Sequence, residues 1–126
     1  MWVLYVIIPV LVLLGLWLFL IAPGSSRGME KFKKAKYAHR GLHGTVDADT
    51  YAAENSLTAF RRAVEHGFGI ELDVQLSRDG EVMVFHDYTL IRMTGVDKKL
   101  CELDRSELCE LTLAESDQKI PTFSEV

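Results

Sequence analysis

The sequence contains only two cysteines, Cys101 and Cys109, among 126 residues. Their spacing matches no common zinc pattern, in which cysteines come in pairs roughly two to four residues apart. So few cysteines are typical of a protein in a reducing compartment and argue against a small secreted domain held together by disulfides. We therefore assign neither cysteine a functional role.

Basic residues are also few, with 14 Lys and Arg against 18 Asp and Glu and a net charge of −4. The chain has no basic stripe with interleaved aromatic residues, which is the usual sequence mark of a nucleic-acid-binding surface. It also has no internal repeat and no low-complexity tract, and its length allows one modest domain. We expect no nucleic-acid partner.

Charged residues are absent from residues 2–22. A run of this length can cross a hydrocarbon layer roughly 30 Å thick as a helix. A cleaved signal peptide is the alternative, but such a peptide begins with basic residues and has an apolar run of about 7–15 residues. Here no Lys or Arg precedes the run, and the run is longer. We predict a single transmembrane helix over residues 2–22.

A linker follows over residues 23–35, opening with Pro23 and Gly24. Because basic residues close to a membrane span tend to stay in the cytoplasm, we expect the domain inside and the N-terminus outside. The basic residues that follow the predicted span could also attract anionic lipid headgroups of the bilayer. The basic residues in and just after the linker are Arg27, Lys31, Lys33, Lys34 and Lys36.

Residues 69–76 alternate apolar and polar side chains with period two, which predicts a β-strand. One face carries Glu71 and Asp73, and two carboxylates at this spacing lie roughly 7 Å apart, close enough to share a divalent cation. The same alternation is also typical of an ordinary solvated strand face. The apolar face consists of Ile70, Leu72, Val74 and Leu76.

Asp79-Gly80 predicts a tight hairpin turn, which makes residues 82–86 an antiparallel partner of the preceding strand. With these two residues as the loop, Asp73 would pair with His86. His86 would then lie beside the carboxylates, since cross-strand partners share a face. A register slip of one residue would place His86 on the opposite face.

Residues 36–39 predict a short strand, and a helix follows with Asn55 or Ser56 as its cap and Gly67 at its end. A strand-helix-strand order predicts that the two strands are parallel. Sites in such folds form at the carboxyl ends of the strands, which is where His39 and Arg40 lie.

The polar residues suit phosphoryl chemistry. One imidazole can take a proton while a second gives one to the leaving oxygen, and His39 and His86 are the candidates. Arg40 can hold a phosphate through two hydrogen bonds. Glu54 precedes the helix, and a hard cation on the carboxylates would neutralise developing charge.

Over residues 36–126 the order of these motifs resembles the glycerophosphodiester phosphodiesterase family. The matching segments are Ala38-His39-Arg40-Gly41, Glu54-Asn55-Ser56, Gly69-Ile70-Glu71-Leu72-Asp73-Val74, Arg78-Asp79-Gly80, Val84-Phe85-His86-Asp87 and Ile120-Pro121-Thr122.

The resemblance implies an α/β fold, namely a transmembrane helix followed by the first part of a distorted (β/α)8 TIM-type barrel. It also implies hydrolysis of glycerophosphodiesters to glycerol 3-phosphate and an alcohol, with Ca²⁺ or Mg²⁺ as the cofactor. The implied roles are acid and base for His39 and His86, phosphate binding for Arg40, and metal binding for Glu71, Asp73 and Glu54, with His86 as an alternative ligand.

The sequence departs from the family in one respect. Family members draw a further metal-binding Glu from a later strand, whereas this sequence ends just after Thr122 and Glu125, a helix-capping pattern. We expect the front part of a larger, truncated barrel. Two alternatives remain open: a lysophospholipase D activity that releases a choline or ethanolamine head group, or an inactive fragment.

Overall fold

A computed structural model describes residues 2–22, 24, 27–30, 32–45, 51–114 and 116–126. The chain divides into two compact units, Met1–Lys34 and Ala35–Val126.

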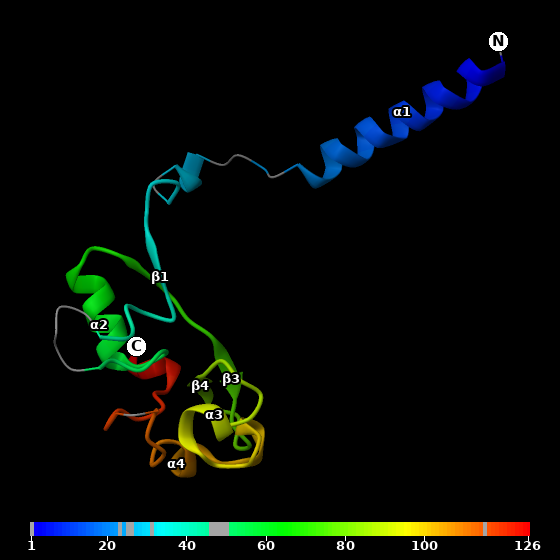
Figure 1. Cartoon of the computed structure of the whole chain (residues 1–126). Helices are drawn as coiled ribbons and strands as arrows, with labels where there is room; N and C mark the ends of the chain where they lie inside the picture. The colour runs from blue at the N-terminus through cyan, green and yellow to red at the C-terminus, as the bar shows by residue number, and fades with distance from the viewer. Residues whose placement is uncertain (1, 23, 25–26, 31, 46–50, 115) are drawn as a thin grey trace. The chain divides into compact units, whose positions relative to one another are not determined.

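The first unit is mainly one long apolar helix, α1 (Trp2–Ile21), which accommodates Pro9 (Figure 1). The helix is long and apolar enough to cross a membrane, a property that a signal sequence near an N-terminus would share. A 3-10 turn, η1 (Arg27–Met29), follows in the expected linker. Pro23, Ser25, Ser26 and Lys31 of that linker lie outside the described residues.

The second unit opens with the predicted strand-helix-strand order: β1 (Tyr37–His39), α2 (Leu57–Glu65) and β2 (Gly69–Glu71). β1 and β2 are parallel, as predicted, and His39 is the register partner of Glu71. Ser56 is the helix cap, since its hydroxyl accepts a hydrogen bond from the backbone N–H of Ala59 at 3.1 Å.

The turn after β1 packs tightly on α2. Gly41 has φ +79°, and a Cβ at this position would come within 2.8 Å of the backbone of Ala59. Glycine is the residue that adopts this backbone conformation without strain and leaves that space free. The turn and the start of α2 are therefore held in direct contact.

The hairpin forms as predicted, but with a different register. β3 (Val74–Leu76) and β4 (Val82–Val84) are antiparallel, and Val74 pairs with Val84. The expected pairing of Val74 with Phe85, and of Asp73 with His86, is therefore wrong by one residue. The backbone carbonyl of Asp73 instead accepts a hydrogen bond from the backbone N–H of Phe85 at 2.9 Å.

The register differs because the loop has three residues, 78–80, in place of two. Ser77 closes the hairpin: its N–H donates to the carbonyl of Glu81 at 3.0 Å, and its hydroxyl accepts from the N–H of Glu81 at 2.9 Å. Gly80 has φ +83°, which suits the left-handed last position of a three-residue hairpin loop.

The strand predicted over residues 69–76 is divided between β2 and β3, which belong to two separate two-stranded sheets. Leu72 and Asp73 lie at the break between them. In β3, the apolar Val74 and Leu76 side chains are 50% and 59% exposed. The apolar face of this segment is thus not covered over its second half.

The segment after the hairpin folds back on it and builds most of the core (Figure 1). It contains α3 (Ile91–Thr94), η2 (Leu100–Glu102), α4 (Arg105–Leu108) and η3 (Phe123–Glu125). The buried cluster consists of Ala53, Met83, Phe85, Leu90, Met93, Leu100, Leu103, Leu108, Leu113 and Ile120.

Candidate active site

The carboxyl end of β1 carries the first part of the candidate site. Arg40 adopts the left-handed conformation with φ 57°, which costs an L-residue about 1–2 kcal/mol. In this conformation its backbone N–H donates to Oε2 of Glu71 at 3.1 Å. Nε2 of His39 lies 4.0 Å from the same oxygen. The adjacent parallel strands therefore bring the first imidazole and the first carboxylate together.

The Arg40 side chain lies between two further carboxylates. Nη1 donates to Oε1 of Glu54 at 3.0 Å, and Nε lies 3.5 Å from Oδ2 of Asp73. Only 16% of the Arg40 side chain and 15% of the Glu54 side chain are exposed. Nε is buried and has no hydrogen-bond acceptor among the residues that the structure describes. The guanidinium of Arg40 is thus enclosed between the carboxylates of Glu54 and Asp73.

Asn55 fixes the position of Asp73. Its backbone is also left-handed, with φ 54°, a conformation that Asn tolerates better than most residues. Its side-chain amide donates to Oδ2 of Asp73 at 3.1 Å and accepts from the backbone N–H of Asp73 at 3.4 Å. The segment before α2 therefore holds the chain at the break between β2 and β3.

Arg92, on α3, contacts Glu54 from a second direction. Its guanidinium donates to both oxygens of Glu54 at 2.6 and 3.3 Å and to both oxygens of Asp87 at 2.6 and 3.0 Å. Burial by itself would raise the pKa of Glu54, but the hydrogen bonds and charges of Arg92 and Arg40 outweigh it and lower that pKa. The hydrogen bonds from Arg92 also lower the pKa of Asp87 to about 2.

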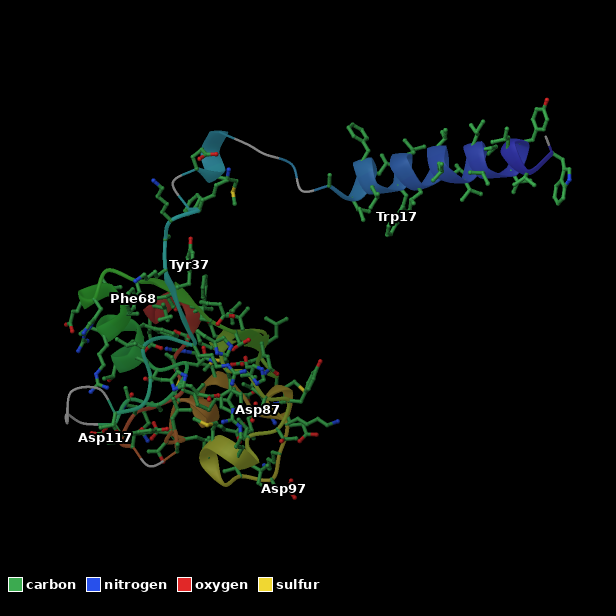
Figure 2. All side chains as sticks on the ribbon, turned by 45° about the horizontal axis from the view of Figure 1, so that its top comes forward. Trp17, Tyr37, Phe68, Asp87, Asp97 and Asp117 are labelled. Carbon is green, nitrogen blue, oxygen red and sulfur yellow. The ribbon has the colours of Figure 1, made fainter. Side chains whose placement is uncertain are left out.

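His86 follows β4 and is held by Asp87, whose Oδ1 lies 2.6 Å from its Nδ1. The side-chain amide of Gln75 donates to the carbonyls of Phe85, His86 and Asp87 at 2.8–3.0 Å. An open cavity of about 600 Å³ borders this segment. Figure 2 labels Asp87, whose side chain lies among those of the hairpin and of the segment that folds back on it. The cavity is lined by Asp73, Val74, Gln75, Phe85, His86, Asp87 and Tyr88.

The structure groups most of the residues singled out in the sequence, though not in the way we expected. His39, Arg40, Glu54, Glu71 and Asp73 form one continuous set of contacts. His86 does not join this set by pairing with Asp73. It is connected to it through ion pairs that run from Asp87 to Arg92 to Glu54.

Two residues of this network had no assigned role in the sequence analysis. Asp87 directly follows His86 in the segment Val84-Phe85-His86-Asp87. Because a carboxylate can orient a neighbouring imidazole, this adjacency is the signal in the sequence that could have indicated Asp87. Arg92 lies 38 residues away from its partner Glu54. No local pattern in the sequence indicates that pairing.

The carboxylates match a hard divalent cation in kind but do not complete a site. Glu71 and Asp73 offer oxygen ligands, whereas both oxygens of Glu54 already accept hydrogen bonds from guanidinium groups. Across the described ranges no group of three or more His, Cys, Asp or Glu is arranged to hold a metal ion. A metal bound here would need ligands in addition to these two.

A polar cluster at the carboxyl end of a strand that opens a strand-helix-strand unit is the arrangement found in β/α-barrel proteins. The family model for the glycerophosphoryl diester phosphodiesterase family matches residues 39–126. The chain belongs to this family, as the sequence motifs predicted.

Known proteins agree with this assignment. The chain is 37% identical over 97 residues to human glycerophosphodiester phosphodiesterase 1, covering 70% of this chain and 28% of that protein. It is 34% identical over 114 residues to a lysophospholipase D of Rattus norvegicus, covering 79% and 34%. It is also similar to an Oleispira antarctica phosphodiesterase solved with its product sn-glycerol-3-phosphate, with 32% identity, a TM-score of 0.64 and coverage of 74% and 38%.

The likeness to solved barrel phosphodiesterases confirms the predicted fold class, the first part of a (β/α)8 barrel preceded by an apolar helix. The chain spans about a third of the length of the curated relatives it matches.

The ion pairs of Asp87 predict an acid-dependent stability. Its folded pKa of about 2 lies below its usual 3.8. Between these two pKa values the unfolded chain binds more protons than the folded chain, so the free energy of unfolding rises with pH. The stabilisation that the ionised Asp87 contributes is fully present above about pH 4 and is lost as the pH falls through about 2. We expect Asp87→Asn to destabilise the full chain at pH 5, and the difference from the wild type to shrink toward pH 2. Thermal unfolding in detergent micelles, followed by circular dichroism, measures this.

The matched control is Asp97→Asn, a change at an exposed carboxylate on the same segment (Figure 2). It should leave the stability nearly unchanged over the same pH range. An Asp87→Asn deficit that stayed constant down to pH 2 would contradict the ion-pair explanation.

Proposed function

We propose that this chain carries the front part of the active site of a membrane-anchored glycerophosphodiester phosphodiesterase. The observation that supports this is the connected set of contacts that runs from His39 and Arg40 through Glu54 and Arg92 to Asp87 and His86. Two imidazoles can serve as acid and base, and a guanidinium can stabilise the charge of a phosphodiester during its hydrolysis.

In the proposed reaction Arg40 holds the phosphodiester through its guanidinium. One imidazole accepts a proton from a water molecule, whose oxygen attacks the phosphorus. The ester P–O bond on the far side breaks, and the second imidazole donates a proton to the departing alcohol oxygen. The products are glycerol 3-phosphate and an alcohol.

The contact with Asp87 indicates which nitrogen of His86 takes part. Asp87 is ionised at neutral pH because its pKa is about 2, so it accepts a hydrogen bond from Nδ1 of His86. Nε2 is then the nitrogen left to exchange a proton with substrate or water. In the same way a carboxylate orients the imidazole in catalytic triads.

The imidazoles give the direct test. We expect His39→Ala and His86→Ala each to lower kcat of the full chain by roughly 10²–10⁴-fold, the usual contribution of acid–base catalysis. The matched control is His43→Ala, an exposed histidine four residues after His39, which should retain normal kcat. Release of glycerol 3-phosphate from glycerophosphocholine, with Ca²⁺ or Mg²⁺ present, measures this. Near-normal turnover in both site variants would reject the assigned roles.

Lysophospholipids are the second candidate substrates, because one relative is named a lysophospholipase D. The same assay run with lysophosphatidylcholine separates the two activities, since free choline then appears together with lysophosphatidic acid. If the wild-type chain turns over neither substrate, it acts as an inactive fragment, the third possibility raised by its sequence.

We further propose Ca²⁺ or Mg²⁺ as the cofactor, since the family is generally dependent on a divalent metal. Glu71 and Asp73 would supply two ligands, and Glu54 would contribute only if it released a guanidinium. When bound, such a cation neutralises charge on the phosphoryl oxygens.

Metal binding can be measured without turnover. We expect isothermal titration of the wild-type chain with CaCl₂ or MgCl₂ to give saturable binding that Glu71→Gln weakens at least about tenfold, since removing an anionic ligand removes charge attraction. Glu65→Gln, on α2, is the control and should leave the affinity unchanged. Equal affinity in all three proteins would exclude Glu71 as a ligand.

The α1 helix supports the proposal of a single-pass membrane anchor with the domain in the cytoplasm. In sealed right-side-out vesicles, added protease should then spare the domain, and detergent should make it sensitive. Cleavage of the domain without detergent would show that the domain lies outside. Release of the chain by alkaline carbonate would exclude a transmembrane anchor.

A further inference from the structure

Arg92 makes more polar contacts around the candidate site than the proposed reaction uses. We propose that Arg92 is a positioning residue that aligns His86 and Arg40 with each other, by holding Asp87 and Glu54 at the same time. This inference rests on the proposed function and adds to it a residue that touches neither the substrate nor the reacting atoms.

The geometry of the guanidinium carries the argument. Nε and Nη2 donate to the two oxygens of Asp87 at 2.6 and 3.0 Å, and Nη2 and Nη1 donate to the two oxygens of Glu54 at 2.6 and 3.3 Å. Each carboxylate therefore accepts hydrogen bonds from two donors of the same guanidinium, which fixes its orientation as well as its position.

Each of the two carboxylates holds one group of the proposed reaction. Asp87 lies 2.6 Å from Nδ1 of His86, and Glu54 accepts from Nη1 of Arg40 at 3.0 Å. Charges alternate from Arg40 through Glu54 and Arg92 to Asp87, and Asp87 in turn contacts the imidazole of His86. Arg92 is the central member of this series and joins the segment before α2 to the segment after β4.

Arg92 acts at the surface of the domain and is not part of the buried core. Its side chain is 48% exposed. Arg92 belongs to α3, a helix of four residues. The next residue in the sequence, Met93, is the member of α3 that enters the buried cluster. Nη1 also donates to the sulfur of Met93 at 3.1 Å.

The chain provides a matched control in Arg78. Its guanidinium also bridges two carboxylates, Asp104 and Glu107, and its side chain is 55% exposed. It is thus an ion-pair centre of the same kind that contacts neither imidazole and neither of the acids held by Arg92.

Turnover gives the first readout in the full chain. We expect Arg92→Gln to lower kcat about 10- to 100-fold, because a misplacement of roughly 1 Å can reduce a rate about 10²-fold. KM should change less than kcat. Arg92→Lys should restore only part of the lost kcat. An ammonium group keeps the charge but cannot form the planar, bidentate hydrogen bonds of a guanidinium to two carboxylates. Arg78→Gln should leave kcat and KM unchanged.

A double variant separates positioning from general loss of structure. In the His86→Ala background, Arg92→Gln should lower kcat by a clearly smaller factor than in the wild type, because part of its effect acts through the imidazole. The same factor in both backgrounds would overturn the proposal. If Arg92→Gln fails to fold by circular dichroism, Arg92→Lys takes its place in this comparison.

A second readout does not require turnover. In chain labelled with ¹⁵N-histidine, the Nδ1 resonance of His86, assigned by its loss in His86→Ala, reports the hydrogen bond to Asp87. Arg92→Gln should move it and Arg78→Gln should not. If the wild-type chain is inactive while this resonance moves, the proposed function fails and the positioning role stands. An unmoved resonance together with an unchanged kcat would reject the role of Arg92.

Discussion

The arrangement of this domain depends on one largely buried carboxylate, that of Glu54, which two guanidinium groups neutralise from different directions. A carboxylate that is 15% exposed loses much of its hydration, and such a loss is tolerated when charged donors replace the water. The donors come from the end of β1 and from α3, which are distant in the sequence. Neutralising this one group therefore draws the segment after the hairpin onto the opening strand-helix-strand unit.

Two residues of the same region have left-handed backbones, Arg40 and Asn55. Such conformations persist where the surroundings stabilise them, and they concentrate at functional sites. Here the compensation is visible. The N–H of Arg40 is directed at Glu71 because of its unusual φ, and the amide of Asn55 holds both the side chain and the backbone of Asp73. The strain thus accompanies contacts between groups that the proposed chemistry requires to be adjacent.

Sequence patterns predicted the parts of the fold that local chemistry decides. Ser56 and Gly67 mark the ends of α2 because capping and a left-handed turn act within a few residues. The hairpin register was missed because Asp79-Gly80 fits a two-residue loop as well as a three-residue one, and the hydroxyl of Ser77 favours the longer loop. Arg92 was missed because its partners are selected by tertiary packing, which leaves no periodic mark in the sequence.

Gly41 shows how a residue without a side chain can set a dimension of the site. The turn after β1 approaches α2 so closely that a single added carbon would collide with the helix backbone. The segment just before that helix carries Glu54, and the turn carries Arg40. The absence of a side chain at Gly41 therefore sets the distance between the Glu54 carboxylate and the Arg40 guanidinium. A bulkier residue at this position would push the turn away from the helix and so increase that distance, without contacting either group.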